Sequence, residues 1–110
     1  METGIYRMQL KSSGNIVEAE ALLVGNKLKG GGQGYSIQGC LQEKDTVLTG
    51  TVNIKKCDKQ TAAVLGLFKE VTFEITGRYE REKNAFYFEG RFQAHHSIVI
   101  RATGCFAKGL

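Results

Sequence analysis

The sequence of 110 residues has no proline, no tryptophan and only two histidines. No apolar run approaches the roughly 18 residues that a membrane-spanning helix needs. Residues 1–4 carry neither a basic end nor an apolar stretch, so we expect no secretory signal. Charges are balanced, with 15 Lys+Arg against 11 Asp+Glu, which is unlike a disordered polyelectrolyte. These absences predict one soluble, cytoplasmic domain over residues 1–110, with no membrane partner.

Cysteine is also scarce. The three cysteines are Cys40, Cys57 and Cys105. An odd number without a CxxC spacing argues against a disulfide framework and against a zinc site. Because each lies in a strand-like segment, we expect small thiols that are buried or half-buried, in a reducing compartment.

Residues that could perform catalysis do not gather in the pattern. His95 and His96 are adjacent, so in a strand they point to opposite faces and cannot bind one metal together. Four glutamates alternate with apolar residues and therefore point outward: Glu18, Glu20, Glu74 and Glu89. Without paired inward carboxylates we predict no catalytic residues, no metal and no cofactor, and hence a protein that is not an enzyme.

The dominant hydrophobic period is two residues, which is typical of half-buried strands. The period is clear over residues 17–23, 36–41, 48–54, 71–80, 86–92 and 98–106, and short polar turns separate the segments. The pattern predicts an all-β fold, a small eight-stranded antiparallel up-and-down barrel. Residues 58–67 are rich in Ala and Leu and do not alternate, so either a short helix near 59–67 or a loose crossover is expected there.

Glycine is abundant, at 14 residues, and five glycines share the frame of the apolar face: Gly39, Gly50, Gly77, Gly90 and Gly104. Their missing side chains are therefore predicted to face the interior, where they let a sheet bend into a small barrel. A further run, Gly30–Gly34, is interpreted as a tight turn. It lacks the GK[ST] that follows in a phosphate loop, and its role stays open.

Aromatic residues dominate the predicted interior. The inward frames carry Phe73, Tyr79, Phe86, Phe88, Phe92 and Phe106. In a barrel of this size these side chains either fill the core or line a pocket for one small apolar ligand. The sequence does not decide between the two.

The net charge of +4 raises the question of nucleic-acid binding. Lys55, Lys56 and Lys59 form one cluster, but the arginines at 78, 81, 91 and 101 are interleaved with glutamates. Cross-strand pairs of opposite charge explain that pattern, so direct nucleic-acid binding is not expected.

Short motifs in the N-terminal half resemble a known family. Gly4-Ile5-Tyr6 opens the first strand, a basic turn Lys27-Leu28-Lys29 precedes Gly30-Gly31, and Gln38-Gly39 follows with Leu41 and Glu43 beyond it. This arrangement resembles the GrlR-type negative regulators of type III secretion, which are small calycin-like (lipocalin-like) β-barrels. The resemblance is clearest over residues 4–50. It departs from the family at Gly32, where an aspartate is usual, and at Ile37, where a tyrosine is usual.

The resemblance implies a cytoplasmic homodimeric barrel that binds a helix-turn-helix transcriptional activator and keeps it from DNA. In the best-studied member of the family, an exposed acidic cluster in the next hairpin engages the partner. The matching positions are Glu43, Lys44 and Asp45, where a lysine between two acids weakens the negative charge. Outward apolar residues such as Leu22, Val24, Tyr87 and Val99 are candidates for the dimer face. The alternative function is a carrier of a small apolar ligand inside the barrel.

Overall fold

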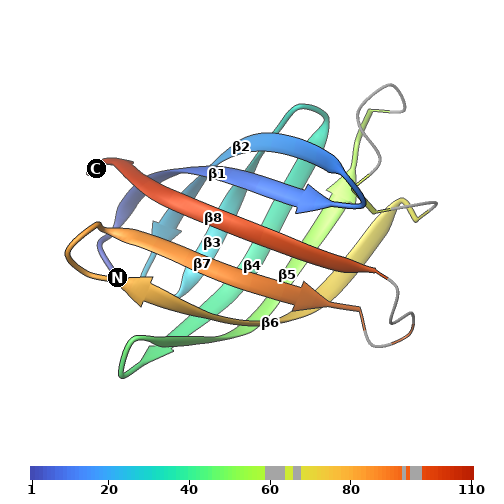
Figure 1. Cartoon of the computed structure of the whole chain (residues 1–110). Coiled ribbons are helices and arrows are strands. Elements are labelled where there is room, and N and C mark those ends of the chain that lie inside the picture. The colour runs from blue at the N-terminus through green and yellow to red at the C-terminus, as the bar shows by residue number, and fades with distance from the viewer. Residues whose placement is uncertain (59–63, 66–67, 93, 95–97) are drawn as a thin grey trace.

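The computed structural model describes residues 1–58, 64–65, 68–92, 94 and 98–110. The strands are β1 (Gly4–Ser12), β2 (Asn15–Val24), β3 (Lys27–Gly32), β4 (Tyr35–Lys44), β5 (Val47–Lys56), β6 (Glu70–Glu80), β7 (Ala85–Arg91) and β8 (Val99–Lys108). Each strand pairs antiparallel with the next, and β8 pairs with β1 to close the barrel (Figure 1). The predicted eight-stranded up-and-down barrel is confirmed.

The alternation in the sequence is the reason that these segments form strands. In β6, Val71, Phe73 and Ile75 are buried, whereas Thr72 and Glu74 between them are exposed. Because successive side chains of a strand point to opposite faces, one frame fills the interior and the other meets water. The glutamates at 18, 20, 74 and 89 lie on the outward frame, as predicted.

Two hairpins are tighter than the sequence suggested. Gly30–Gly32 belong to β3, and the turn is only Gln33–Gly34, with φ angles of 49° and 86°. Likewise β4 continues through Lys44, so the turn there is Asp45–Thr46, with φ angles of 51° and 68°. Two-residue turns with positive φ match the twist of the strands that they join, which lets both strands run to the turn itself.

The inward glycines serve two packing purposes. At Gly104 a β-carbon would lie 2.2 Å from the Phe86 ring, so the glycine makes room for an aromatic side chain. At Gly77 it would lie 1.9 Å from the carbonyl oxygen of Tyr87, so the glycine lets the neighbouring strand approach. Of the five glycines predicted to face inward, Gly90 and Gly104 are buried and Gly39, Gly50 and Gly77 are half-buried. The contacts at Gly104 and Gly77 show that close packing, and not only sheet bending, requires a missing side chain.

Hairpins alternate between the two ends of the barrel, and both chain termini lie at one end (Figure 1). We call this the terminal end. At the other end Val64 and Leu65 are fully buried, and the backbone N–H of Val64 donates to the Tyr35 hydroxyl over 3.1 Å. The helix considered near 59–67 falls outside the described residues, except for 64–65, which form a turn. The described residues contain no helix that is long and apolar enough to span a membrane.

Candidate functional site

The β4–β5 hairpin, which carries the predicted partner-binding residues, projects at the terminal end. Lys44 and Asp45 are exposed at its tip. The carbonyl of Thr46 accepts a hydrogen bond from the backbone N–H of Tyr79 over 2.8 Å, which ties the tip to β6. The hairpin is therefore held in place while its tip remains open to a partner.

Glu43 is placed differently from its two neighbours. Its carboxylate contacts the amino group of Met1 at 3.1 Å and the guanidinium of Arg81 at 3.4 Å, and its side chain is only 11% exposed. Of the two acids in the hairpin, only Asp45 is exposed and takes no part in these two ion pairs. The low exposure of Glu43 could be predicted from the sequence, because Glu43 lies in the same inward frame of β4 as the buried Leu41.

A polar cluster closes the terminal end of the barrel beside Glu43. The hydroxyl of Tyr6 donates to the carbonyl of Glu2 over 2.7 Å and lies 3.4 Å from Asn84 Oδ1. The hydroxyl of Tyr79 also donates to Asn84 Oδ1. Tyr6 and Tyr79 are buried, so these bonds satisfy polar groups that would otherwise be costly to bury.

The environment of this cluster disfavours the charged form of Tyr6. Its pKa is raised well above the ordinary value, first because the hydroxyl is buried, then because Tyr79 lies beside it, with smaller contributions from Glu2 and Glu43. The hydroxyl therefore stays protonated in the folded protein over the physiological range, where it can donate its hydrogen bond.

This shift predicts a loss of stability in alkali. Above about pH 10 the unfolded chain gives up the Tyr6 proton while the folded protein keeps it, so the free energy of unfolding falls as the pH rises. Urea unfolding at pH 8 to 11 should show this decline, and Tyr6→Phe should make it shallower. An equally steep decline in Tyr6→Phe would contradict the assignment to Tyr6.

The six aromatic residues predicted to be inward divide into two groups. Phe73, Tyr79, Phe86 and Phe88 are buried, whereas Phe92 and Phe106 are partly buried at the margin of the core. The Phe86 ring lies 5.1 Å from the Tyr6 ring and 6.0 Å from the Phe88 ring, centroid to centroid. Rings at these distances pack against one another, which favours the core-filling interpretation over a ligand pocket.

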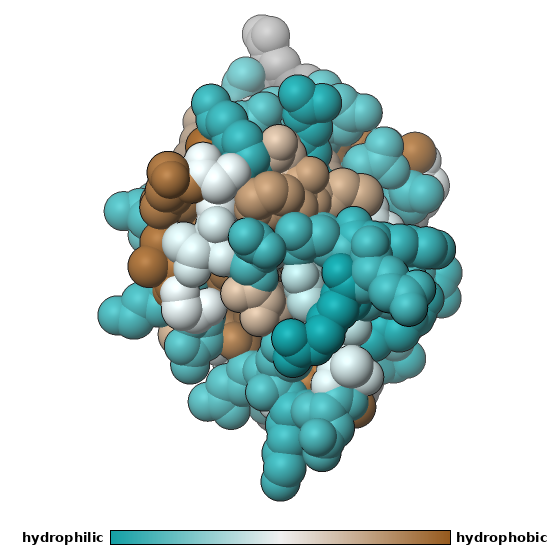
Figure 2. Space-filling model, turned by 90° about the vertical axis from the view of Figure 1, so that its left-hand side faces the viewer, coloured by the Kyte–Doolittle hydropathy of each residue, from teal (hydrophilic) through white to brown (hydrophobic). Residues whose placement is uncertain are grey.

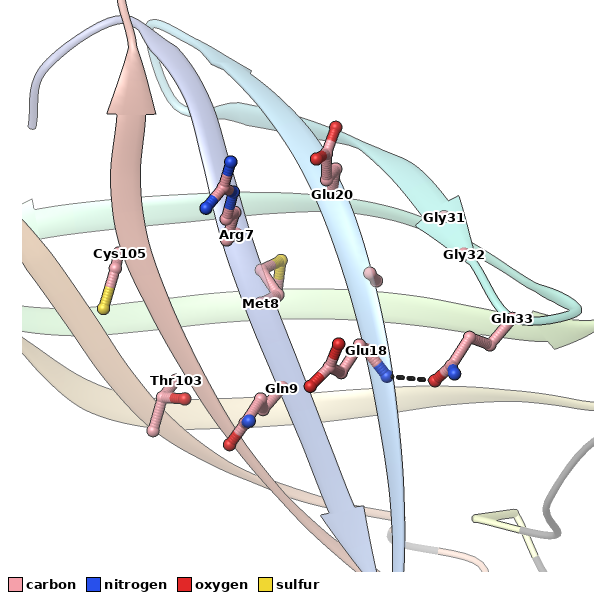
Figure 3. Close-up of a pocket in the computed structure, with 11 residues that line it drawn as sticks. Arg7, Met8, Gln9, Glu18, Glu20, Gly31, Gly32, Gln33, Thr103 and Cys105 are labelled. Atoms are coloured by element: carbon pink, nitrogen blue, oxygen red, sulfur yellow. Dashed lines mark hydrogen bonds between the residues drawn. The ribbon is translucent and has the colours of Figure 1, made fainter.

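A groove on the outer wall was not predicted from the sequence. It has a volume of about 940 Å³ and runs over β1, β2, β8 and the end of β3 (Figure 3). Its polar lining is Arg7, Gln9, Glu18, Glu20, Gln33, Thr103 and Cys105. The Gln33 side-chain oxygen accepts the backbone N–H of Glu18 over 2.5 Å, beyond the point where β3 stops pairing with β2.

The chemistry of this groove suits contact rather than catalysis. Arg7 stands opposite Glu20 across the two strands, so both signs of charge are present at an open surface. A catalytic site benefits from excluding water, which this open wall does not do. The sequence signal was Gly31-Gly32, which line the groove. At Gly32 the missing side chain lets β3 lie close to β2, because a β-carbon there would lie 2.7 Å from the carbonyl oxygen of Glu18.

The remaining residues with reactive side chains are the cysteines and the histidines. All three cysteines are exposed, so the expectation of buried or half-buried thiols was wrong. Cys40 and Cys105 sit on the outward frames of β4 and β8, and Cys57 follows the end of β5. His95 and His96 fall outside the described residues. Within the described part of the chain, no three potential metal-ligating side chains come together.

Comparison with known families agrees with this geometry. The family model for the type III secretion system negative regulator GrlR matches residues 1–110. The chain belongs to the GrlR family. The match extends past residues 4–50, where the motifs are clearest, to include β5 to β8. No curated protein matches the sequence. GrlR proteins are regulators of type III secretion, so membership points to regulation rather than to an enzymatic reaction.

Proposed function

We propose that this protein is a non-enzymatic negative regulator of type III secretion that works in the cytoplasm by sequestering a transcriptional activator. The observation that carries the proposal is the GrlR match over the whole chain. The anchored β4–β5 hairpin supports it, because a projecting tip on a rigid barrel is suited to contact another protein. We also propose that the barrel acts as a homodimer, which sedimentation equilibrium of the purified protein would test.

The contact is proposed to use the hairpin tip. Glu43, Lys44 and Asp45 would together face a basic helix-turn-helix activator, with Asp45 supplying the exposed negative charge. Glu43 would contribute less directly, since its carboxylate already contacts Met1 and Arg81. Lys44 would oppose the contact, because its positive charge lies between the two acids.

Two substitutions at the tip should therefore change the affinity in opposite directions. Asp45→Asn removes the charge but keeps a residue that tolerates the φ of 51°, so binding to the activator should weaken several-fold. Lys44→Glu makes the tip acidic and should strengthen binding by a similar factor. Titration calorimetry with the secretion system's purified helix-turn-helix activator, at low and high salt, measures both effects.

Glu70→Gln provides the control, because Glu70 is an exposed acid at the start of β6, at the other end of the barrel. It should leave the affinity unchanged. If all three variants bind with the affinity of the parent protein, the hairpin is not the contact. If the parent protein does not bind the activator at all, the proposed function itself fails.

A further inference from the structure

One outer face of the barrel combines exposed apolar and cationic side chains. Leu22 and Val24 on β2 are 37% and 49% exposed. Lys29 stands opposite Leu22 and Lys27 stands opposite Val24 on the adjoining strand β3, and all four lie on the outward frame. We call these four residues the β2–β3 patch.

The two lysines of the patch have no anionic partner within the described residues. Their other cross-strand neighbours, on β4, are Cys40 and Gln38, which carry no charge. Neither lysine takes part in an ion pair of the described chain. The outward positions of β3, β4 and β5 also carry Lys44 and Lys55 and no exposed carboxylate.

The opposite side of the barrel shows that this is not the general pattern. There Arg91 and Arg101 contact Glu89 at 2.6 and 3.5 Å, and Arg78 contacts Glu80 at 3.3 Å. The guanidinium of Arg78 also lies 4.6 Å from the centre of the Tyr87 ring. On β6 to β8 the arginines at 78, 91 and 101 are thus neutralised within the protein. Lys27 and Lys29 on β3 are in no such pair, although β2 carries the exposed acids Glu18 and Glu20 further along its outward frame.

The surface beside the patch is hollowed. A groove of about 450 Å³ crosses β3, β4 and β5, and its outward lining consists of Lys27, Lys29, Gln38, Cys40, Thr51 and Asn53. The two lysines lie between this groove and the apolar pair Leu22 and Val24. Apolar side chains also reach the surface at the terminal end, within a largely hydrophilic rim (Figure 2).

We propose that the β2–β3 patch binds an acidic amphipathic segment of a partner protein. Carboxylates of that segment would pair with Lys27 and Lys29, and its apolar side chains would cover Leu22 and Val24. Charge complementarity supports this occupant, since two uncompensated lysines flank exposed apolar area. The surface is separate from the hairpin tip at Asp45 and opposite to it in charge, so it would take a different ligand.

Two other occupants fit less well. A second copy docked through the same patch by a two-fold axis would bring four such lysines together, and like charges across an interface are unfavourable. A nucleic acid would satisfy the lysines but leave Leu22 and Val24 uncovered. The outward positions of β3, β4 and β5 also offer no aromatic ring on which a base could stack.

The experiment uses the full chain, labelled with ¹⁵N, and a synthetic 15-residue peptide of interspersed glutamates and leucines as the probe. Chemical-shift changes should centre on residues 20–29 and 38–40. Lys27→Glu combined with Lys29→Glu should raise the dissociation constant at least tenfold, and Leu22→Ser combined with Val24→Ser should also weaken binding. The matched control, Lys11→Glu with Lys69→Glu, changes the net charge equally on exposed residues outside the patch and should bind normally.

Several results would overturn the proposal. One is shift changes spread evenly over the β6–β8 face, and another is an affinity unaffected by the Lys27/Lys29 double substitution. A duplex oligonucleotide that binds as tightly, with no effect of the Leu22/Val24 substitution, would indicate general polyanion binding. A dimer that the Leu22/Val24 substitution dissociates would assign the patch to a second copy. The Lys27/Lys29 and Leu22/Val24 variants should bind the activator normally. The proposed function would then hold even if the proposal for the β2–β3 patch failed.

Discussion

Replacing Gly77 with alanine is expected to destabilise the barrel by about 3 kcal/mol, the upper end of the usual penalty for overpacking. A β-carbon there would lie 1.9 Å from the Tyr87 carbonyl oxygen and 2.6 Å from the α-carbon of Phe88. Both atoms belong to the backbone of β7, so no side-chain rotation relieves the clash and the two strands must separate. Because Gly77 pairs with Phe88 in the centre of the ladder, the neighbouring pairs would be disturbed as well.

Denaturant unfolding monitored by circular dichroism measures the loss of free energy, and thermal unfolding measures the change in Tm. Gly109→Ala is the matched control, because the nearest atom to its β-carbon would be Phe106 Cζ at 4.0 Å. The control should unfold like the parent protein, whereas Gly77→Ala should lose on the order of 10 °C in Tm. Equal stability of the two variants would mean that β6 and β7 do not need the glycine.

Phe86→Ala should reduce stability by about 3–5 kcal/mol, the range typical of a buried phenylalanine. The ring is fully buried and packs between the rings of Tyr6 and Phe88. Gly104 lies against the same ring, so its lack of a side chain would enlarge the cavity left by the substitution. Phe68→Ala makes the same chemical change at a side chain that is 39% exposed and should have a clearly smaller effect.

The same variant distinguishes a filled barrel from a ligand carrier. An apolar cavity left by Phe86 should take up a small aromatic molecule such as benzene, and this should raise the stability of the variant. The parent protein, whose rings already occupy that space, should show no such response. If benzene or a fluorescent fatty acid stabilises the parent protein to the same extent, the interior is a binding site and the carrier function gains support.

The strand order could be predicted because it depends on local patterns. Alternation over segments such as 71–80 requires one buried face, and short polar turns allow only neighbouring strands to pair. The shared frame of the inward glycines then indicated a small closed barrel. The strand frame also placed Cys40 and Cys105 outside, so the error about buried thiols came from weighting residue type above position.

The candidate sites depended on contacts between residues far apart in the chain. Glu43 is paired because Met1 and Arg81 come to the same end of the barrel, and neither is near it in sequence. The arginines at 91 and 101 are neutralised because β7 and β8 both place them beside Glu89. The sequence by itself determined the barrel, the outward face of each strand and the family resemblance of its N-terminal half. Only the tertiary structure decided which outward charges are already paired, because pairing depends on the register between strands and on which turns meet at each end.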